Sequence, residues 1–212
     1  MSGIFITFEG PEGAGKTLQA ERLAEALRGR GQRVRLIREP GATRLGEEIR
    51  SIVLARAMDG DAGIDARADA LLFNAARAQL VAEVIQPALT AGETVICARF
   101  ADSTLAYQGY GAGVPLDELR AIAAVATAGL VPDLTILLDA PPEVGLARKA
   151  DEARNRFEAA FDLEFHRRVR AGFLELARQE PGRWRVVDAT RDVDEVFAEV
   201  LAATGPGSGP AR

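Results

Sequence analysis

A glycine-rich segment near the start constrains this chain more than any other feature. Residues Gly10 to Thr17 fit the pattern Gly-x-x-x-x-Gly-Lys-(Ser/Thr). A short apolar run, Ile4 to Phe8, precedes the segment, and apolar residues at helical spacing, from Ala20 to Leu27, follow it. A strand, this loop and a helix in that order form a phosphate-binding P-loop, so the sequence predicts one here. The competing interpretation is a glycine-rich turn that only caps a helix.

The chemistry of phosphate binding explains the residue types in this segment. Glycines let successive backbone N–H groups converge on phosphates, and the N-terminus of the following helix adds a favourable dipole. Lys16 neutralises the β and γ oxygens of a triphosphate, and the Thr17 hydroxyl ligates Mg²⁺. We therefore predict that a nucleoside triphosphate and Mg²⁺ bind through Gly10, Glu12, Gly13, Ala14, Gly15, Lys16 and Thr17.

Composition limits the number of domains and the classes of partner. The chain has 212 residues, 48% of them hydrophobic, so we predict one domain over residues 1–204 and a disordered, glycine- and proline-rich tail at 205–212. A net charge of −5 argues against binding to polymeric nucleic acid or to an anionic membrane. The start of the chain carries no signal-like or membrane-spanning stretch, and the single cysteine, Cys97, forms no internal disulfide, so we expect a cytoplasmic location.

Short apolar runs alternate with longer segments of helical character. This alternation predicts an α/β fold of the P-loop NTPase type, in which a five-stranded parallel sheet carries helices on both faces. The predicted strands are Ile4–Phe8, Val34–Ile37, Thr94–Cys97, Leu134–Leu138 and Arg185–Val187. Two glycines, Gly29 and Gly31, are expected to end the helix that follows the P-loop.

A P-loop alone is compatible with a GTPase, an ATP-driven motor or a kinase of small molecules. Three further segments bear on the choice: Arg38–Thr43 follows the second predicted strand, Leu71–Arg77 lies in a predicted helix, and Ala98–Gly109 follows the third predicted strand. In their order and approximate spacing around the P-loop, these segments resemble the bacterial thymidylate kinases, over roughly Ile4 to Thr190. The resemblance implies transfer of the γ-phosphoryl group of ATP to dTMP, giving dTDP and ADP.

The same resemblance implies roles for individual residues and a homodimeric assembly. Phe73 would stack on the thymine ring, Arg38 and Arg77 would hold the acceptor phosphate, and Arg99 would bridge the donor and acceptor phosphates. Phe73 and Arg77 are four positions apart, so they share one helix face. Taken alone, Phe73 could equally face the core and Arg77 could be a solvated surface residue. The implied acceptor site is completed by Glu9, Pro40, Ser103, Thr104, Tyr107 and Gln108.

A basic cluster follows the fourth predicted strand and resembles the arginine-bearing lid of the bacterial enzymes. The cluster contains Arg148, Lys149, Arg154 and Arg156, and we place the lid at about residues 147–158. A lid arginine stabilises charge on the transferring phosphoryl group and helps to exclude water. Because the P-loop itself carries no arginine, we assign this role to Arg154 rather than Arg148. The predicted catalytic residues are therefore Lys16, Arg99 and Arg154. A solvated helix face is the alternative for the cluster.

The chain departs from the family pattern immediately before Arg99. Ala98 stands where the family usually has an acidic residue that could orient magnesium or the attacking phosphate. Glu9, Glu12 and Asp102 are candidates to replace it. The acceptor oxygen is a phosphate oxygen, already anionic near neutral pH, so it needs little help from a general base.

Smaller departures and conspicuous residues have simpler interpretations. Asn155 replaces the usual lid aspartate, and Ala42 replaces a glycine that can more readily adopt positive φ, so the loop after the second strand is expected to differ in shape. His166 has no partner at metal-ligand spacing and is expected on a helix surface. Cys97 is expected to be a buried hydrophobe, and Asp139, at the end of the fourth strand, to be structural.

Two competing functions remain open from the sequence, and a third is disfavoured. The chain could phosphorylate a different nucleoside monophosphate. It could also be a paralogue or an altered variant that binds nucleotides without turnover, because Ala98 removes a carboxylate. A GTPase is disfavoured because the Asn-Lys-x-Asp guanine signature is absent from the sequence.

Overall fold

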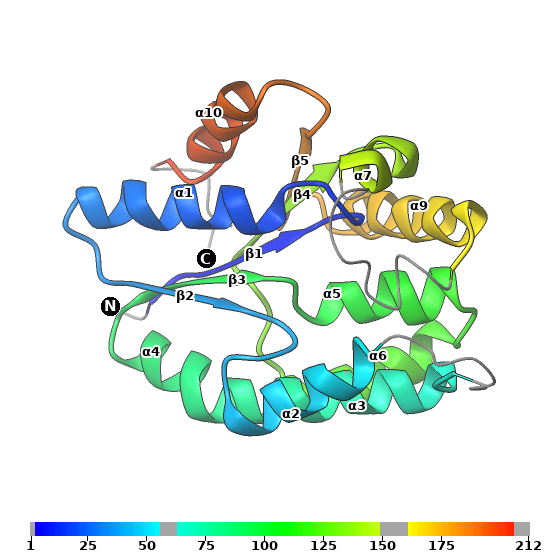
Figure 1. The fold of residues 1–212 in the computed structure, drawn as a ribbon. Helices are drawn as coiled ribbons and strands as arrows, with labels where there is room; N and C mark the ends of the chain where they lie inside the picture. Colours follow the sequence, from blue (N-terminus) through cyan, green and yellow to red (C-terminus); the bar gives the residue numbers. More distant parts are fainter. Residues whose placement is uncertain (1–2, 56–62, 149–160, 206–212) are drawn as a thin grey trace.

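A parallel sheet of five strands forms the centre of the molecule (Figure 1). The computed structural model describes residues 3–55, 63–148 and 161–205. All four strand pairings are parallel, and the strand order is β2-β3-β1-β4-β5. The strands are β1 (Phe5–Glu9), β2 (Val34–Arg38), β3 (Thr94–Ala98), β4 (Leu134–Asp139) and β5 (Trp184–Asp188). The predicted fold class is confirmed, and each predicted strand is present to within a residue at either end.

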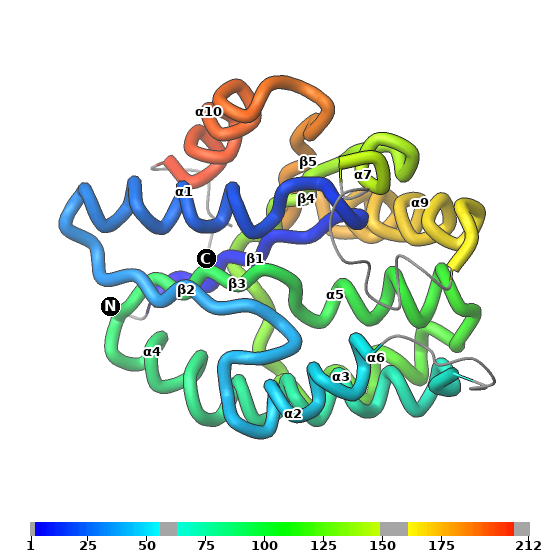
Figure 2. Tube along the Cα trace, in the orientation of Figure 1, coloured from blue at the N-terminus to red at the C-terminus, as the bar shows by residue number. Residues whose placement is uncertain are grey.

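Strand β1, which leads into the P-loop, occupies the middle of the sheet. Its Phe5 lies opposite Val95 of β3, and its Ile6 lies opposite Leu134 of β4. Figure 2 shows this arrangement as a blue segment between green and yellow-green segments that come much later in the chain. Because the strands are parallel, their carboxyl ends meet at one edge, where ligands bind in open α/β sheets. The residues that follow β1, β2 and β3 therefore lie close together.

Helices cover both faces of the sheet. They are α1 (Lys16–Gly29), α2 (Arg44–Val53), α3 (Ala66–Leu80), α4 (Gln86–Thr90), α5 (Ala101–Thr104), α6 (Leu116–Thr127), α7 (Pro142–Arg148), α9 (Leu163–Gln179) and α10 (Val193–Ala203). Two π-helical segments, η1 (Val81–Ile85) and η2 (Leu105–Gly111), extend α3 and α5. Helix α1 ends at Gly29, as the sequence predicts. In the part of the chain described, none of the helices has the length and apolar character needed to cross a membrane.

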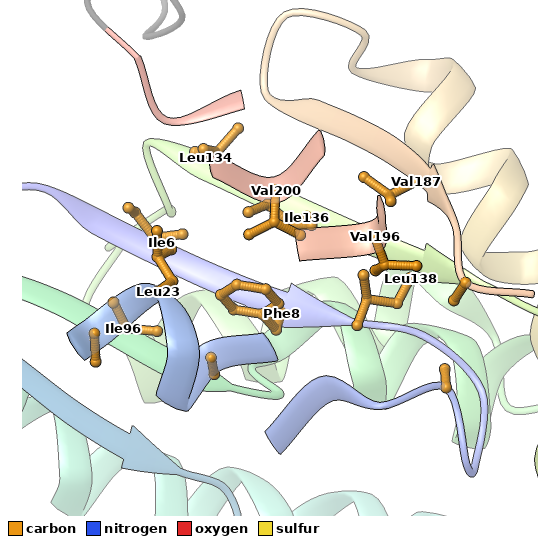
Figure 3. Packing of buried hydrophobic residues seen from close by; sticks show 14 of the residues in the cluster. Ile6, Phe8, Leu23, Ile96, Leu134, Ile136, Leu138, Val187, Val196 and Val200 are labelled. Carbon is orange, nitrogen blue, oxygen red and sulfur yellow. The ribbon is translucent and has the colours of Figure 1, made fainter. Parts of the chain in front are cut away.

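The alternation of side chains along β1 separates two parts of the core. Ile6 and Phe8 pack with Leu23 of α1 and Val200 of α10 on one face (Figure 3). Phe5, the neighbour of Ile6, belongs instead to the cluster formed with η1 and α4 on the other face. Burial of large apolar side chains at about 1.5–3 kcal/mol each fixes the sheet between its helices.

Local capping and turn residues fix where the site-bearing helices begin. Helix α2 starts after Thr43, whose Oγ1 accepts a hydrogen bond from Gly46 N, and α3 starts after Asp65, whose Oδ1 accepts one from Arg67 N. Gly15 stands at the start of α1 with φ 88°, a left-handed conformation that glycine adopts without strain. The predicted domain boundary at residue 204 remains a prediction, and the predicted tail lies outside the described residues apart from Gly205.

Candidate active site

A cavity of about 450 Å³ opens where β1, β2 and β3 end. It brings together residues of the P-loop and of all three acceptor segments. The predicted residues that line it are Glu12, Gly13, Gly15, Lys16, Thr17, Arg38, Pro40, Phe73, Arg77, Arg99, Ser103, Thr104, Tyr107 and Gln108. Of the other predicted site residues in the described part of the chain, Glu9, Gly10 and Ala14 are buried and do not line it.

The P-loop has the backbone geometry that phosphate binding requires. Gly10, Gly13 and Gly15 all have positive φ, at 144°, 69° and 88°. The Nζ of Lys16 lies across the loop and donates hydrogen bonds to Gly10 O at 2.9 Å and Pro11 O at 2.6 Å. The lysine ammonium is thus held over the segment at which a triphosphate is predicted to bind.

Arg99 connects the P-loop to the acceptor segments. Its Nη2 lies 2.5 Å from Glu12 Oε1 and donates to Tyr107 Oη at 3.2 Å, while its Nη1 donates to Ser103 Oγ at 3.3 Å. Tyr107 Oη in turn donates to Glu12 Oε1 at 3.0 Å. Burial is the largest influence on the pKa of Arg99 and lowers it, but the charges of Glu12, Tyr107 and Glu9 together outweigh burial and raise the pKa overall, so the guanidinium stays charged. One cation therefore contacts both halves of the cavity.

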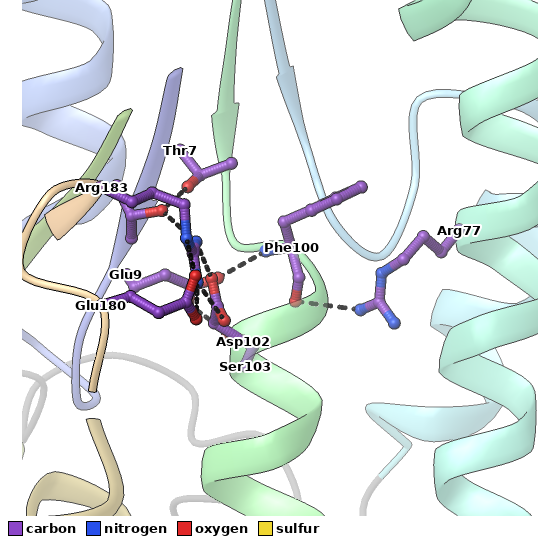
Figure 4. A network of polar contacts seen from close by, with 9 residues as sticks. Thr7, Glu9, Arg77, Phe100, Asp102, Ser103, Glu180 and Arg183 are labelled. Carbon is purple, nitrogen blue, oxygen red and sulfur yellow. Dashed lines mark hydrogen bonds and ion pairs between the residues drawn. The ribbon is translucent and has the colours of Figure 1, made fainter. Parts of the chain in front are cut away.

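The carboxylate of Glu9 holds the backbone that carries Arg99. Glu9 Oε1 accepts from Phe100 N at 2.7 Å, and Oε2 accepts from Ser103 Oγ at 2.6 Å (Figure 4). These bonds fix the chain immediately after Arg99, which takes φ 71°, an uncommon conformation for a residue with a side chain. Burial, followed by the charge of Asp102, raises the pKa of Glu9 from an ordinary 4.5 to about 7.

Asp102 is engaged in a buried ion pair with Arg183, the residue immediately before β5. Arg183 Nη1 donates to Asp102 Oδ2 at 2.7 Å, and Nη2 donates to Oδ1 at 3.1 Å (Figure 4). Arg183 also donates to Thr135 Oγ1 of β4 at 2.7 Å. Both carboxylate oxygens of Asp102 are occupied by this bidentate contact, and Asp102 does not line the cavity. The pair ties α5 to β4 and β5, so Asp102 is a poor candidate for orienting magnesium.

Arg77 lines the cavity, yet it is 1% exposed and bonded on every nitrogen. Its Nε donates to Glu39 Oε2 at 2.9 Å, and its Nη1 donates to Asn74 Oδ1 at 2.9 Å. Its Nη2 donates to Phe100 O at 3.0 Å and to Thr104 Oγ1 at 3.2 Å. These bonds use four of the five N–H groups of a guanidinium. Arg77 can therefore donate at most one more hydrogen bond without breaking contacts to the protein.

Arg50 of α2 also lines the cavity, although the sequence reasoning did not identify it. Its Nη1 donates to Pro40 O at 2.9 Å. Burial, followed by the charges of Arg38 and Arg99, lowers the pKa of Arg50. Three guanidinium groups thus gather near the end of β2, an arrangement suited to an anion. Arg50 lies four positions after the buried Gly46, so it stands on the face of α2 that packs inward. A cation on that face was the signal in the sequence that could have identified Arg50.

Comparison with known proteins identifies the family. A thymidylate kinase family model matches residues 8–200. The thymidylate kinase of Deinococcus radiodurans is 54% identical over 202 residues, covering 95% of this chain and 96% of the relative. The chain belongs to the thymidylate kinase family. The thymidylate kinase of Solidesulfovibrio magneticus is 49% identical, over 95% of this chain and 99% of the relative.

The fold of the family is also recognisable in a solved structure. The crystal structure of thymidylate kinase from Ehrlichia chaffeensis has a TM-score of 0.76 and 33% identity with this chain, and the match covers 96% of this chain and 98% of that one. The resemblance inferred from the sequence is therefore confirmed. The comparisons do not favour the alternatives of a GTPase or of a paralogue that binds nucleotides without turnover.

The structure revises several expectations about single residues. Ala42 takes positive φ, 63°, despite its side chain, and its N–H donates to Glu47 Oε1 at 2.9 Å, so the expected change of loop shape is not seen in its backbone conformation. The left-handed conformation costs about 1–2 kcal/mol. His166 is 2% exposed on α9, so its predicted surface position is wrong. Cys97 is buried, as predicted, and Asp139 pairs with Arg170 through both oxygens at 2.7 Å, consistent with a structural role.

Most of the predicted lid lies outside the described residues. Lys149, Arg154, Asn155 and Arg156 therefore remain predictions of the sequence alone. Arg148, which ends α7, lines the cavity, and its Nη1 donates to Ala189 O at 2.9 Å. Arg148 thus links the end of α7 to the segment after β5.

Proposed function

We propose that this protein transfers the γ-phosphoryl group of ATP to dTMP, with Mg²⁺, giving ADP and dTDP for dTTP synthesis. Membership of the thymidylate kinase family supports the proposal, and one geometric observation carries it to this chain. Arg99 contacts Glu12 of the P-loop on one side and Ser103 and Tyr107 of the acceptor segments on the other. A single cavity with a cation between two nucleotide-binding halves suits transfer between two phosphates.

The proposed step requires positioning and charge stabilisation rather than proton abstraction. An oxygen of the dTMP phosphate attacks the γ-phosphorus of ATP while the bond to the β–γ bridging oxygen breaks, and ADP leaves with that electron pair. Lys16 stabilises charge on the donor phosphates. Arg38, Arg50 and Arg99 hold the acceptor phosphate, and Phe73 offers a flat surface for the base. Arg77 is expected to add at most one hydrogen bond, so we place it beside the nucleoside rather than in a clasp around the phosphate.

The residues present fit a magnesium ion held largely by the nucleotide. Thr17 is exposed at the start of α1 and lines the cavity. Within the described residues, three or more His, Cys, Asp or Glu side chains do not gather into a metal-binding group. Mg²⁺ usually keeps several waters and needs few protein ligands beside substrate phosphates. We therefore assign the direct contact to Thr17; bound there, Mg²⁺ would neutralise charge on the β and γ oxygens. Ala98 then leaves any further ordering of its waters to the carboxylate of Glu12, which lines the cavity; Glu9, like Asp102, has both oxygens occupied and does not line it.

Three finer points are also proposals. Arg154 is expected to contribute its charge from the lid. A homodimer is supported by large apolar side chains that stay exposed on neighbouring helices: Leu45, Ile52 and Leu71 are 41%, 52% and 56% exposed on α2 and α3. Exposed apolar side chains of this size are common at subunit interfaces. We also propose a cytoplasmic location.

A coupled assay of ADP release tests the proposed function. The parent chain and Ala98→Asp are compared with ATP, Mg²⁺ and dTMP, dUMP or dGMP, with a control lacking any acceptor. We expect dTMP-dependent turnover in the parent. Turnover that appears only in Ala98→Asp, together with tight nucleotide binding by the parent, would establish a binding protein that has lost catalysis. Faster turnover with another monophosphate would assign a different acceptor.

A further inference from the structure

The amide of Gln108 contacts a buried carboxylate that the mechanism above does not use. Gln108 belongs to η2, a π-helical segment of the kind found at functional sites, and it lines the cavity. Its Nε2 donates to Asp69 Oδ2 at 3.0 Å. Both residues are 3% exposed. Asp69 lies on α3, one turn before Phe73, so it stands on the helix that is proposed to support the acceptor base.

This contact decides which end of the amide is available. A glutamine amide can rotate to exchange a donor NH₂ for an acceptor oxygen, and the two ends have nearly the same shape. Asp69 Oδ2 accepts the hydrogen bond from Nε2, so this contact selects the orientation in which Nε2 points toward Asp69. The amide oxygen, Oε1, is then directed away from Asp69. In the described part of the chain, Oε1 of Gln108 receives no hydrogen bond.

We propose that Asp69 is a positioning residue that fixes Gln108 as a hydrogen-bond acceptor in the cavity and thereby selects acceptor bases with a ring N–H. The proposal rests on the proposed function, because it concerns the base of the accepted monophosphate. Thymine and uracil carry a donor at N3, whereas cytosine carries an acceptor there. Two acceptors facing each other in a buried site leave both without a partner, which rejects the wrong base more strongly than a change in shape does.

The Asp69→Asn variant tests this inference because its side chain has nearly the same shape but can donate as well as accept. Gln108 can then rotate its NH₂ toward the cavity. We measure kcat/KM for dTMP and dCMP at saturating ATP. The ratio of kcat/KM for dTMP to kcat/KM for dCMP is expected to fall about 10- to 100-fold, mainly through changes in KM. The KM for ATP should stay constant. Asp65→Asn is the matched control, since asparagine is also a good N-cap for α3, and it should leave the ratio unchanged.

Two results would overturn the inference. One is an unchanged dTMP to dCMP ratio in Asp69→Asn, and the other is an equal loss with both substrates, which indicates a purely structural role. If Asp69→Asn does not fold, Gln108→Leu removes the acceptor directly, and the same fall in the ratio is required. Equilibrium binding of dTMP and dCMP gives a second readout that does not depend on turnover. A parent that binds dTMP selectively but does not phosphorylate it would contradict the proposed function and leave this inference intact.

Discussion

The backbone of α7 lies against the backbone of the P-loop, and this contact permits a sharp test by mutation. A Cβ atom built on Gly145 would stand 2.0 Å from Glu12 O, and one built on Gly13 would stand 1.9 Å from Gly145 O. Neither position has room for a side chain. The change Gly145→Ala adds a single methyl group at this contact, and the atom it meets belongs to the main chain rather than to a flexible side chain.

The size of the expected effect follows from this distance. Real Cβ atoms essentially never come within 3.0 Å of such a neighbour, so α7 and the P-loop must separate by about 1 Å. Overpacking of this kind costs about 1–3 kcal/mol of stability. The displaced residue, Glu12, holds both Arg99 and Tyr107. Because a displacement of about 1 Å in a catalytic constellation can cost about 100-fold in rate, we expect kcat to fall by about that factor.

Steady-state assays of ADP release and thermal unfolding measure the two effects separately. The matched control is Gly29→Ala, because Gly29 also lies in a helix and a Cβ there meets no atom within 4 Å. We expect the control to keep the activity of the parent and its stability to within about 1 kcal/mol. The reasoning is refuted if Gly145→Ala retains kcat within a factor of two, or if it loses stability without losing activity.

Buried charge leads to three further predictions. Arg183→Leu leaves Asp102 without its cation and should lower the free energy of unfolding, measured in urea titrations, by about 3–5 kcal/mol. Adding Asp102→Asn should restore part of this loss. An unchanged stability in Arg183→Leu would contradict the ion-pair assignment. Burial raises the pKa of Glu9 to about 7, so the folded state favours the neutral carboxyl, and the stabilisation present below pH 4.5 is lost as the pH rises through 7. From pH 4.5 to 7.5, the free energy of unfolding of the parent should therefore fall by about 3 kcal/mol relative to that of Glu9→Gln. A difference between the two proteins that does not change with pH would argue against the raised pKa. Arg50→Gln should raise the KM for dTMP about 10- to 100-fold and leave the KM for ATP unchanged. The control Arg44→Gln, on the exposed face of α2, should change neither KM. An equal rise in the KM for dTMP and for ATP in Arg50→Gln would exclude a specific role in acceptor binding.

Features that depend on local sequence were predictable. The P-loop could be located because a strand, a fixed glycine pattern and a helix occur together within about 25 residues. The α/β class followed from short apolar runs whose spacing leaves room for crossover helices. The residues at the ends of β1, β2 and β3 were expected to meet because parallel strands share one carboxyl edge, and the cavity confirms that they do.

Features that depend on contacts between distant segments were not predictable. The sequence identifies Arg77, but it does not show that Glu39, 38 positions away, occupies its guanidinium. Arg50 carries no motif, and its proximity to Arg38 and Arg99 arises only from the path of the chain around the end of β2. His166 was placed on the wrong face of its helix because a single residue does not define which side of a helix packs inward.

The central place of β1 has a consequence for synthesis on the ribosome. Glu9 and Phe100 are 91 positions apart, and Thr7 and Thr135, whose hydroxyls lie 2.9 Å apart, are separated by 128. At about 5–20 residues per second, the P-loop waits about 6–25 s for the strands that support it. The apolar run that becomes β1 has no sheet partner until β3 emerges, and it lacks its second partner until β4 emerges. Nascent chains should therefore need protection from aggregation, and nucleotide should be unable to stabilise them until β4 has emerged.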